Sequence, residues 1–451
     1  MRLLWATAIA GALVASTAIA QAQVTAPKLD VASPEVLLAY SVVDALASGQ
    51  YAKIIADLDD AMKAALPEQK LTATWNAVLS QVGAFKRRGS ARSAEQKGST
   101  LVIVPCEFDK GVIEVLVAMN SAGKISGLSI RAPVAPAPYT PPVYVDASKY
   151  AESDVKIGAA PWELPGTLTV PAGPGPFPAV ILIHGSGPND RDETIGPNKP
   201  FKDLALGLAS RGIAVLRYEK RSRQYGSKAT AVENFTVKQE VIDDVVAAAA
   251  LLRKTAGINP ARIVAVGHSL GAMLIPRIAQ ADPQLAGLVM LSAPAVPLEE
   301  AVVRQTRYLA NADGQISPEE QKQIDAAVAI ADAVRRLVAS DRLGGVTIGG
   351  TPASYWLDLR GYDVSKAAAS LKQPLLVIQG ERDYQVTMDD FATLRAALGT
   401  KPGVTLRSYP ALNHLLIPGE GKSMPIEYTR AGHVAEDVVR DIAAWIASTI
   451  K

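Results

Sequence analysis

Ser269 lies in the middle of the pentapeptide GHSLG at residues 267–271, which fits the pattern G-x-S-x-G. The preceding run, residues 262–266, is apolar and β-branched like a buried strand, and the residues that follow have helical composition. In a tight turn from strand to helix, glycines on either side of the serine relieve crowding, and the hydroxyl stands exposed near the helix N-terminus. Backbone N–H groups there favour developing negative charge. The pattern predicts a nucleophile elbow, and its alternative is a plain glycine-rich turn.

A serine hydroxyl is a weak nucleophile near neutral pH, so it needs a histidine to accept its proton and a carboxylate to orient that histidine. The chain has four histidines. His184 ends an expected strand, and His268 lies inside the elbow, where it is too constrained to act on its neighbour. His414 follows the last expected strand, where the base of this arrangement belongs, whereas His433 starts the final amphipathic helix. The sequence therefore favours His414 as the base and leaves a supporting role open for His433.

The acid of such a set is expected after a strand that lies between the serine and the histidine. Residues 375–379 form an apolar run that ends in the turn GERD, where Asp383 stands at the expected place. Glu381 is the nearest competing carboxylate, and we interpret it as a solvated loop charge. The order serine, aspartate, histidine is that of α/β-hydrolases.

The negative charge on a tetrahedral intermediate needs two hydrogen-bond donors. The backbone N–H of Leu270, next after the serine, is expected to be one of them. The stretch HGSG at residues 184–187 follows another expected strand, and its glycines allow a backbone amide to turn inward. We expect the second donor to be the backbone N–H of Ser186, with a plain Gly-Pro turn as the alternative.

Composition narrows the class of protein. The 451 residues are 49% hydrophobic and 20% charged, which is ordinary for a globular protein with more than one domain. Basic and acidic residues nearly cancel, at 46 and 44, and there is no long basic run, so nucleic acid is not an expected partner. Cys106 is the sole cysteine and cannot form an intrachain disulfide. No residue pattern implies a metal or an organic cofactor.

Residues 1–22 have the form of a secretory signal peptide. Arg2 supplies the positive start, residues 3–15 supply the apolar stretch, and cleavage is expected after Ala20 or Ala22. The apolar stretch is short for a bilayer-spanning helix, so no stable membrane anchor is expected after cleavage, and an uncleaved anchor is the alternative. Export without a disulfide indicates the bacterial periplasm or secretion.

The first folded part, residues 33–132, is predicted to be a small α+β domain. Three helices are expected at about residues 33–49, 51–65 and 68–82, and strands of period two at 99–108, 112–119 and 125–130. This part resembles the domain of unknown function that often precedes secreted hydrolases, through FK at 85–86, CEF at 106–108 and GKI at 123–125. The resemblance implies a cystatin-like or nuclear-transport-factor-like fold. We find no clustered His, Ser or Cys in it, so packing, dimerisation or substrate guiding is expected, and a homo-oligomer stays open.

A Pro- and Ala-rich linker is expected at residues 133–152, followed by a second domain at 153–451. The second domain alternates strands with helices, which implies an α/β fold with a mostly parallel sheet covered on both faces. The expected strands are residues 155–157, 164–170, 179–184, 214–217, 263–266, 287–291, 375–379 and 404–408. The expected helices are residues 201–210, 237–255, 270–281, 389–398 and 435–448.

An insertion at about residues 295–372 is too long for an ordinary connection and has helical composition, so it is expected to form a cap over the active edge of the sheet. Within it, residues 311–316 followed by Glu320 resemble a calcium-binding loop. Leu309 stands where that loop needs an acidic ligand, whereas Ser317 and Glu320 make a good capping box. The plain helix start is therefore favoured. The Ala, Val and Leu content of the cap suggests apolar acyl or alkyl groups in the substrate.

Residues 153–451 resemble the α/β-hydrolase superfamily, in particular secreted bacterial serine esterases similar to dienelactone hydrolases. The resemblance covers about two thirds of the chain and depends on HGSGP at 184–188, RYEKR at 217–221, the elbow, GERD at 380–383 and NH at 413–414. It implies the α/β-hydrolase fold and ester hydrolysis. Serine in place of cysteine at position 269 differs from dienelactone hydrolases proper, so their substrate is not implied.

These features predict a serine carboxylic-ester hydrolase that acts on a small-molecule ester through Ser269, His414 and Asp383, with an acyl-enzyme intermediate. Amide or peptide hydrolysis and acyl transfer use the same three residues, so they stay open as alternatives. The alternative from another class is a binding protein with a vestigial hydrolase domain.

Overall fold

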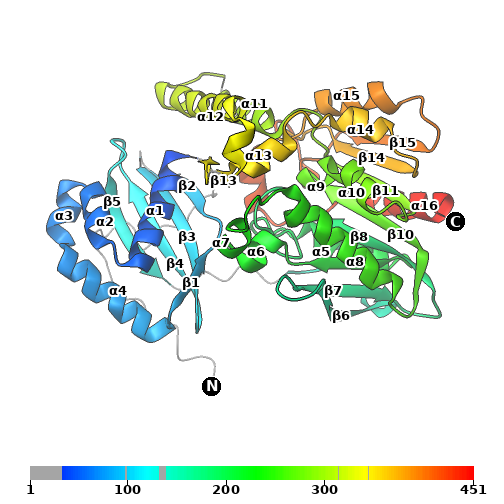
Figure 1. Cartoon of the computed structure of the whole chain (residues 1–451), viewed down its shortest axis with the longest axis horizontal. Helices are drawn as coiled ribbons and strands as arrows, with labels where there is room; N and C mark the ends of the chain where they lie inside the picture. Colours follow the sequence, from blue (N-terminus) through cyan, green and yellow to red (C-terminus); the bar gives the residue numbers. More distant parts are fainter. Residues whose placement is uncertain (1–32, 97–98, 132–138, 313, 344, 451) are drawn as a thin grey trace. The chain divides into compact units, whose positions relative to one another are not determined.

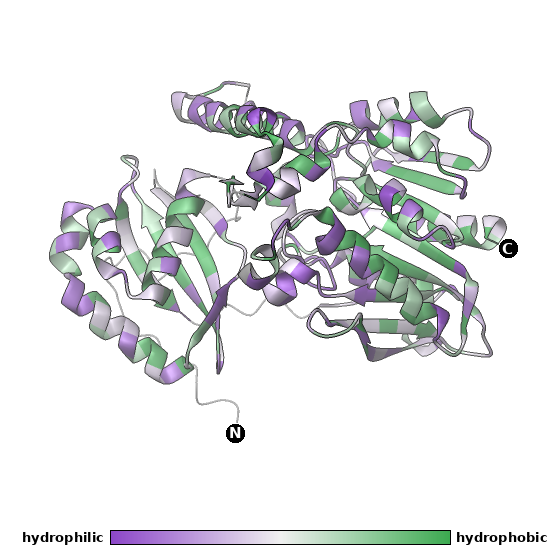
Figure 2. Cartoon of the chain, viewed as in Figure 1, coloured by the Kyte–Doolittle hydropathy of each residue, from purple (hydrophilic) through white to green (hydrophobic). Residues whose placement is uncertain are grey.

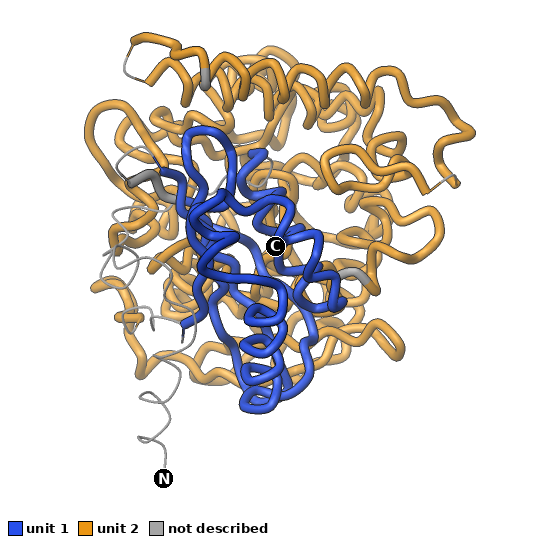
Figure 3. Tube along the Cα trace, turned by 90° about the vertical axis from the view of Figure 1, so that its left-hand side faces the viewer, with its two compact units in different colours: residues 1–137 blue, residues 138–451 orange. Residues whose placement is uncertain are grey.

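The computed structural model describes residues 33–96, 99–131, 139–312, 314–343 and 345–450. The chain divides into two compact units, residues 1–137 and 138–451, which Figure 3 draws in blue and orange. The expected signal peptide, residues 1–22, lies outside the described residues. Within the described part of the chain, no helix combines the length and the apolar character needed to cross a membrane.

The first unit packs helices against an antiparallel sheet (Figure 1). Its helices are α1 (Pro34–Ser48), α2 (Tyr51–Asp57), α3 (Asp60–Ala65) and α4 (Glu68–Val82). Its strands are β1 (Phe85–Arg88), β2 (Arg92–Gln96), β3 (Ser99–Phe108), β4 (Gly111–Met119) and β5 (Ile125–Arg131), in the order β1-β3-β4-β5 with β2 also paired to β3. Trp75 from α4 meets the ring edge of Phe108 from β3 in the core between helices and sheet.

Two features of this unit differ from the sequence prediction. The helix expected at residues 51–65 is two helices, because Asp59 accepts a hydrogen bond from Met62 N and starts α3 as its N-cap. Strands β1 and β2 were not predicted, because their sequences FKRR and RSAEQ are polar and lack a period-two apolar pattern.

The second unit is built on a sheet of eight strands in the order β15-β14-β11-β10-β8-β9-β7-β6. All neighbouring pairs from β15 to β9 are parallel, whereas β7 runs antiparallel to both β9 and β6. The strands are β6 (Tyr150–Ile157), β7 (Leu164–Pro171), β8 (Phe177–Ile183), β9 (Ala214–Tyr218), β10 (Ile258–His268), β11 (Gly287–Leu291), β14 (Leu375–Gly380) and β15 (Val404–Tyr409). The prediction of a mostly parallel α/β sheet is confirmed.

Helices cover both faces of this sheet. They are α5 (Pro200–Ala209), α6 (Arg221–Tyr225), α7 (Ser227–Thr230), η2 (Lys238–Ile242), α8 (Asp243–Arg253), α9 (Leu270–Met273), α10 (Ile275–Ala281), α15 (Met388–Leu398) and α16 (Glu436–Thr449), with the short turns η1 (Ala147–Lys149) and η4 (Pro425–Thr429). Figure 2 shows strands of largely apolar residues beneath helices that mix polar and apolar residues. Because successive strand residues point to opposite faces, Val264 and Val266 pack with α5 and α16, whereas Ala265 packs with α8 and α10.

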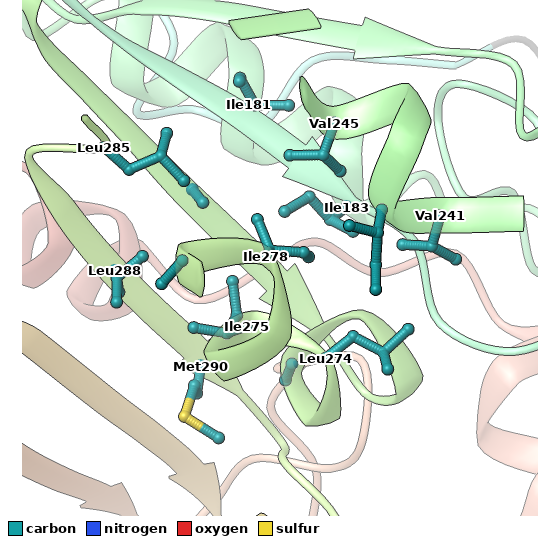
Figure 4. Close-up of a cluster of buried hydrophobic side chains, with 14 of the residues drawn as sticks. Ile181, Ile183, Val241, Val245, Leu274, Ile275, Ile278, Leu285, Leu288 and Met290 are labelled. Atoms are coloured by element: carbon teal, nitrogen blue, oxygen red, sulfur yellow. The ribbon is translucent and has the colours of Figure 1, made fainter. Parts of the chain in front are cut away.

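Figure 4 shows in detail the hydrophobic core on the face of the sheet that α8 and α10 cover. Ile181 and Ile183 of β8 lie close to Val241 and Val245, which η2 and α8 contribute. Leu274, Ile275 and Ile278, from α10 and the residue before it, pack beside Leu288 and Met290 of β11. The core therefore fixes the helices that follow the elbow onto the middle of the sheet.

The second unit begins earlier in the chain than predicted. Tyr139 donates a hydrogen bond from its hydroxyl to Asp203, and the hydroxyl of Tyr144 donates to the backbone oxygen of Val434, both at 2.7 Å. Strand β6 begins at Tyr150, five residues before the expected strand. The linker predicted at 133–152 is thus too long, because its last residues pack on the sheet unit.

The expected cap lies between β11 and β14. It contains α11 (Leu298–Ala310), α12 (Pro318–Arg336), η3 (Ala339–Arg342), β12 (Thr347–Ile348), β13 (Thr351–Pro352), α13 (Ala353–Leu359) and α14 (Val364–Ala369). Helices α11 and α12 lie side by side (Figure 1). The capping box of Ser317 and Glu320 begins α12, which confirms the predicted helix start.

Candidate active site

Ser269 stands at the end of β10 and immediately before α9, in a strained backbone conformation. Its φ is 52° and its ψ is −116°, a region that residues with a side chain rarely adopt. The backbone N–H of Ser269 donates to Leu291 O at 2.9 Å, which holds the turn against β11. A Cβ at position 271 would lie 2.3 Å from Ile183 O, and one at position 267 would lie 2.4 Å from the backbone of Gly271. Only glycine fits at both places, so this local geometry is that of a nucleophile elbow.

Asp383 and His414 form a close pair near this edge of the sheet. His414 Nδ1 lies 2.7 Å from Asp383 Oδ2, and both residues are only 4% exposed. The other carboxylate oxygen accepts hydrogen bonds from the backbone N–H groups of Gln385 and Val386, at 2.8 and 2.9 Å. With its carboxylate fixed in this way, Asp383 can hold the imidazole in one orientation and stabilise a positive charge on it.

Strand order explains why these residues share one edge. Ser269, Asp383 and His414 follow the carboxyl ends of β10, β14 and β15, which run parallel in one sheet. The competing carboxylate, Glu381, is exposed and accepts a hydrogen bond from the hydroxyl of Ser408 at 2.7 Å. His433 lies 3.2 Å from Asp203 of α5. Among the described residues, neither Glu381 nor His433 forms a hydrogen bond or an ion pair with Asp383 or His414.

The loop after β8 lies against the elbow. A Cβ added at Gly185 would be 3.1 Å from Ser269 Cβ, so this loop passes directly beside the candidate nucleophile. Ser186 is exposed, and neither its backbone N–H nor that of Leu270 has an acceptor among the described residues. Two free N–H donors beside the serine are what an oxyanion hole requires.

A buried ion pair, which sequence reasoning missed, lies under the site. His268 Nδ1 is 2.9 Å from Glu193 Oε2, an ionic contact without the alignment of a hydrogen bond. His268 Nε2 is 2.9 Å from the backbone oxygen of His414, and Glu193 Oε1 accepts from Gly185 N at 2.6 Å. Burial alone would lower the pKa of His268, but the Glu193 carboxylate together with the backbone oxygen of His414 and the charge of Asp383 raises that pKa above its usual value. The pair connects the elbow to both neighbouring loops.

His184 has a different environment, although it precedes the same loop. Its ring packs beside Phe201 and against the edge of Tyr218, with centroid separations of 5.2 and 5.3 Å. Burial lowers the pKa of His184 to about 4. The imidazole is therefore neutral at neutral pH and serves the aromatic core, not proton transfer.

The cap is fastened to the loop that carries the acid. Arg304 and Gln305 of α11 both donate to Gln385 O, at 3.3 and 3.2 Å, and Arg304 also donates to Asp390 at 2.5 Å. A cavity of about 400 Å³ opens between α11 and α12, and Arg304 and Arg307 are among its lining residues. Ser269, Asp383 and His414 are not among the residues that line this cavity.

Comparison with known proteins finds matches to both units of the chain. The family model described as "Serine aminopeptidase, S33" matches residues 178–421, which is more than half of the chain. Residues 39–128 match a "Protein of unknown function (DUF3887)". Esterase EstD of Thermotoga maritima is 38% identical over 408 residues, which cover 90% of this chain and 94% of that protein.

The solved structures to which the chain is similar include two esterases. The Pyrococcus furiosus esterase Pf2001 is 20% identical with a TM-score of 0.44, covering 71% of this chain and 99% of that one. Est1E from Butyrivibrio proteoclasticus is 16% identical with a TM-score of 0.42, covering 65% and 99%. The family match over residues 178–421 and the 38% identity to an esterase show that the chain belongs to the serine aminopeptidase, S33, family and is an enzyme of the α/β-hydrolase superfamily.

Proposed function

We propose that this enzyme is a serine carboxylic-ester hydrolase that works through Ser269, His414 and Asp383. The observation that carries the proposal is the buried contact of 2.7 Å between His414 and Asp383, at the same sheet edge as a serine with positive φ. The 38% identity to an esterase over most of both chains supports ester substrates.

In the proposed reaction, Ser269 Oγ attacks the ester carbonyl carbon while His414 Nε2 takes the hydroxyl proton. The Nδ1–H of His414 donates to Asp383, which stabilises the imidazolium, and the N–H groups of Ser186 and Leu270 bind the oxyanion. The carbon–oxygen bond to the alcohol then breaks, and His414 protonates the leaving oxygen. Water, deprotonated by His414, attacks the carbonyl carbon of the acyl-enzyme. The bond from that carbon to Ser269 Oγ then breaks, and His414 returns the proton to Oγ, which releases the carboxylic acid and free Ser269.

Amide or peptide hydrolysis and acyl transfer remain the alternatives, because the same three residues serve each of them. A panel of esters, thioesters and amides with matched acyl groups separates these reactions by their kcat/KM values. Fastest turnover of esters with release of free acid supports the proposal, whereas preference for amides or for a non-water acceptor contradicts it. A binding protein without activity would fail to react with a fluorophosphonate probe.

The first experiment is hydrolysis of p-nitrophenyl esters with acyl chains from two to twelve carbons by the full mature protein and by Ser269→Ala. We expect the substitution to lower kcat by about 10⁶-fold, since the attacking oxygen is lost. Unchanged turnover in Ser269→Ala would rule out the proposed nucleophile. The chain-length optimum reports the depth of the acyl pocket, for which we propose apolar acyl or alkyl groups.

We also propose that the enzyme is exported to the periplasm or the medium of a bacterium, on the basis of the signal-like residues 1–22. Expression with the native N-terminus followed by fractionation and N-terminal sequencing tests this. Cleavage after Ala20 or Ala22 supports export, whereas a full-length protein in the cytoplasm contradicts it.

A further inference from the structure

Lys220 is a buried cation that has no role in the proposed triad. It belongs to the motif RYEKR at residues 217–221, follows β9, and is only 2% exposed. Its Nζ donates a hydrogen bond to the backbone oxygen of Gly185 at 2.8 Å. A lysine is almost never buried so fully unless its charge is paired, so this contact calls for an explanation.

The acceptor of this hydrogen bond belongs to the same peptide group as the proposed oxyanion donor. The C=O of Gly185 and the N–H of Ser186 lie in one planar unit and point in opposite directions in a trans peptide. A cation fixed on the oxygen side therefore turns the N–H of Ser186 away from Lys220. Asn189 also donates to Gly185 O, at 3.2 Å, and Glu193 accepts from Gly185 N at 2.6 Å. The peptide is thus held at its own oxygen and through the peptide plane that precedes it.

From this geometry we infer that Lys220 is a positioning residue for the oxyanion hole, an inference that rests on the proposed function. The ammonium group orients the Gly185–Ser186 peptide and draws electron density toward its oxygen, which makes the N–H of Ser186 a stronger donor. Because it acts on the charge that develops in the transition state, its effect falls on kcat and not on substrate binding.

Lys220 is in turn held by a buried carboxylate. Glu240 Oε1 lies 3.6 Å from Lys220 Nζ, and Glu240 Oε2 accepts a hydrogen bond from the hydroxyl of Tyr355 at 2.7 Å. Glu240 lies in η2, a π-helical turn of the kind that occurs often at functional sites, and Tyr355 belongs to α13 of the cap. Removing two charges from water carries a large desolvation cost. A buried ion pair aimed at one peptide oxygen therefore fits a positioning role better than a purely stabilising one.

The test compares the full-length wild type with Lys220→Met, using Lys238→Met as the matched control, since Lys238 is an exposed lysine on the same π-helical turn. Two constants decide the test for each protein. One is kcat for a p-nitrophenyl ester, with KM obtained from the same assay. The other is the inhibition constant of an alkyl trifluoromethyl ketone, to whose carbonyl carbon Ser269 Oγ adds, which places an oxyanion in the hole. Thermal unfolding of each variant verifies that it is folded.

We expect Lys220→Met to lower kcat by about 10²-fold to 10³-fold, the usual effect of losing one oxyanion donor, with KM changed less than about threefold. The ketone should bind more weakly by a similar factor, and Lys238→Met should match the wild type in both constants. A folded Lys220→Met with wild-type constants overturns the inference, as does a loss of kcat without a loss of ketone affinity. If Lys220→Met does not fold, Lys220→Gln decides by the same two constants.

Ser269→Ala and Lys220→Met together test the proposed function and the role of Lys220 separately. Full activity in Ser269→Ala would overturn the triad whatever Lys220 does. Loss of activity in Ser269→Ala together with an unaffected Lys220→Met would leave the triad standing and overturn the role of Lys220 alone.

Discussion

Glu193 and His268 form a buried ion pair directly below the candidate nucleophile, with 2.9 Å between Oε2 and Nδ1. Both residues are at most 5% exposed. Burial alone would raise the pKa of Glu193, but His268 together with His184 and the backbone N–H of Gly185 lowers that pKa below the usual 4.5, while the pKa of His268 lies above the usual 6.5. The stability from Glu193 is therefore lost as pH falls through its lowered pKa, and that from His268 is lost as pH rises through its raised pKa.

We expect Glu193→Gln to destabilise the enzyme by about 3–5 kcal/mol near pH 6, between these two limits, because it leaves a buried imidazole without its partner. The loss should shrink as pH rises through the raised pKa of His268, because the imidazole then becomes neutral in the wild type as well. Urea unfolding at pH 6 and pH 9 measures both effects. The control Glu381→Gln alters an exposed carboxylate and should shift stability by less than about 0.5 kcal/mol. Equal losses at the two pH values would contradict the ion pair.

Asp383→Asn should lower kcat by about 10⁴-fold, because an amide next to His414 Nδ1 favours the wrong tautomer of the imidazole. KM should change little, since Asp383 is buried and does not reach the substrate. Steady-state hydrolysis of a p-nitrophenyl ester measures both constants. Glu381→Gln serves again as the control and should keep the kcat of the wild type. If its kcat fell as far as that of Asp383→Asn, the assignment of Asp383 as the acid would be wrong.

His184 should make the enzyme sensitive to acid. Its pKa is about 4 in the folded protein against the ordinary 6.5, so an unfolded chain takes up the proton first as pH falls. Stability from this group is therefore lost between pH 6.5 and about 4, by about 3 kcal/mol in total. His184→Phe should flatten this part of the curve of unfolding free energy against pH. An unchanged slope in the variant would show that other groups cause the acid sensitivity.

Gly271→Ala should damage the elbow, because the new methyl group would lie 2.3 Å from the backbone oxygen of Ile183. We expect a destabilisation of about 1–3 kcal/mol and a large loss of kcat as Ser269 shifts. Gly49→Ala is the control, because a methyl group at Gly49 would meet nothing within 4 Å, and Gly49 belongs to the first unit. It should cost about 1–2 kcal/mol and leave kcat unchanged. Unaltered kcat in Gly271→Ala would contradict the tight packing of the elbow.

Cys106 should be inert to thiol reagents in the native protein. Its side chain is fully buried, and burial raises the pKa of the thiol to about 12. Labelling with 5,5′-dithiobis(2-nitrobenzoate) at pH 8 should be immeasurably slow until denaturant unfolds the first unit. Rapid labelling of the native protein would show that the core around β3 opens easily.

The sequence was sufficient for the α/β fold and for the positions of most strands of the second unit along the chain, because apolar runs of five or six residues are long enough to be recognised between helices. Asp383 and His414 could be selected because each follows such a strand. Elements with polar sequences escaped prediction, as β1 and β2 did, since their pairing with β3 gives no periodic signal.

The ionic contacts below the site could not be predicted in this way. Glu193 lies 75 positions before His268 and Lys220 lies 35 positions after Gly185, and no local pattern connects such distant residues. The available signal was the occurrence of charged residues next to apolar strands, as in RYEKR after β9. Such a cluster indicates that a charged side chain is buried, but it does not identify the residue that pairs with it.

The order of the strands places the candidate site residues on two opposite sides of the nucleophile. β10 carries the serine near the middle of the sheet, β14 and β15 supply Asp383 and His414 on one flank, and β8 and β9 supply the Gly185–Ser186 peptide and Lys220 on the other. A negative side chain thus lies to one side of the nucleophile and a positive one to the opposite side. The groups on the two flanks therefore belong to opposite halves of the sheet, because β14 and β15 on one side do not pair with β8 or β9 on the other.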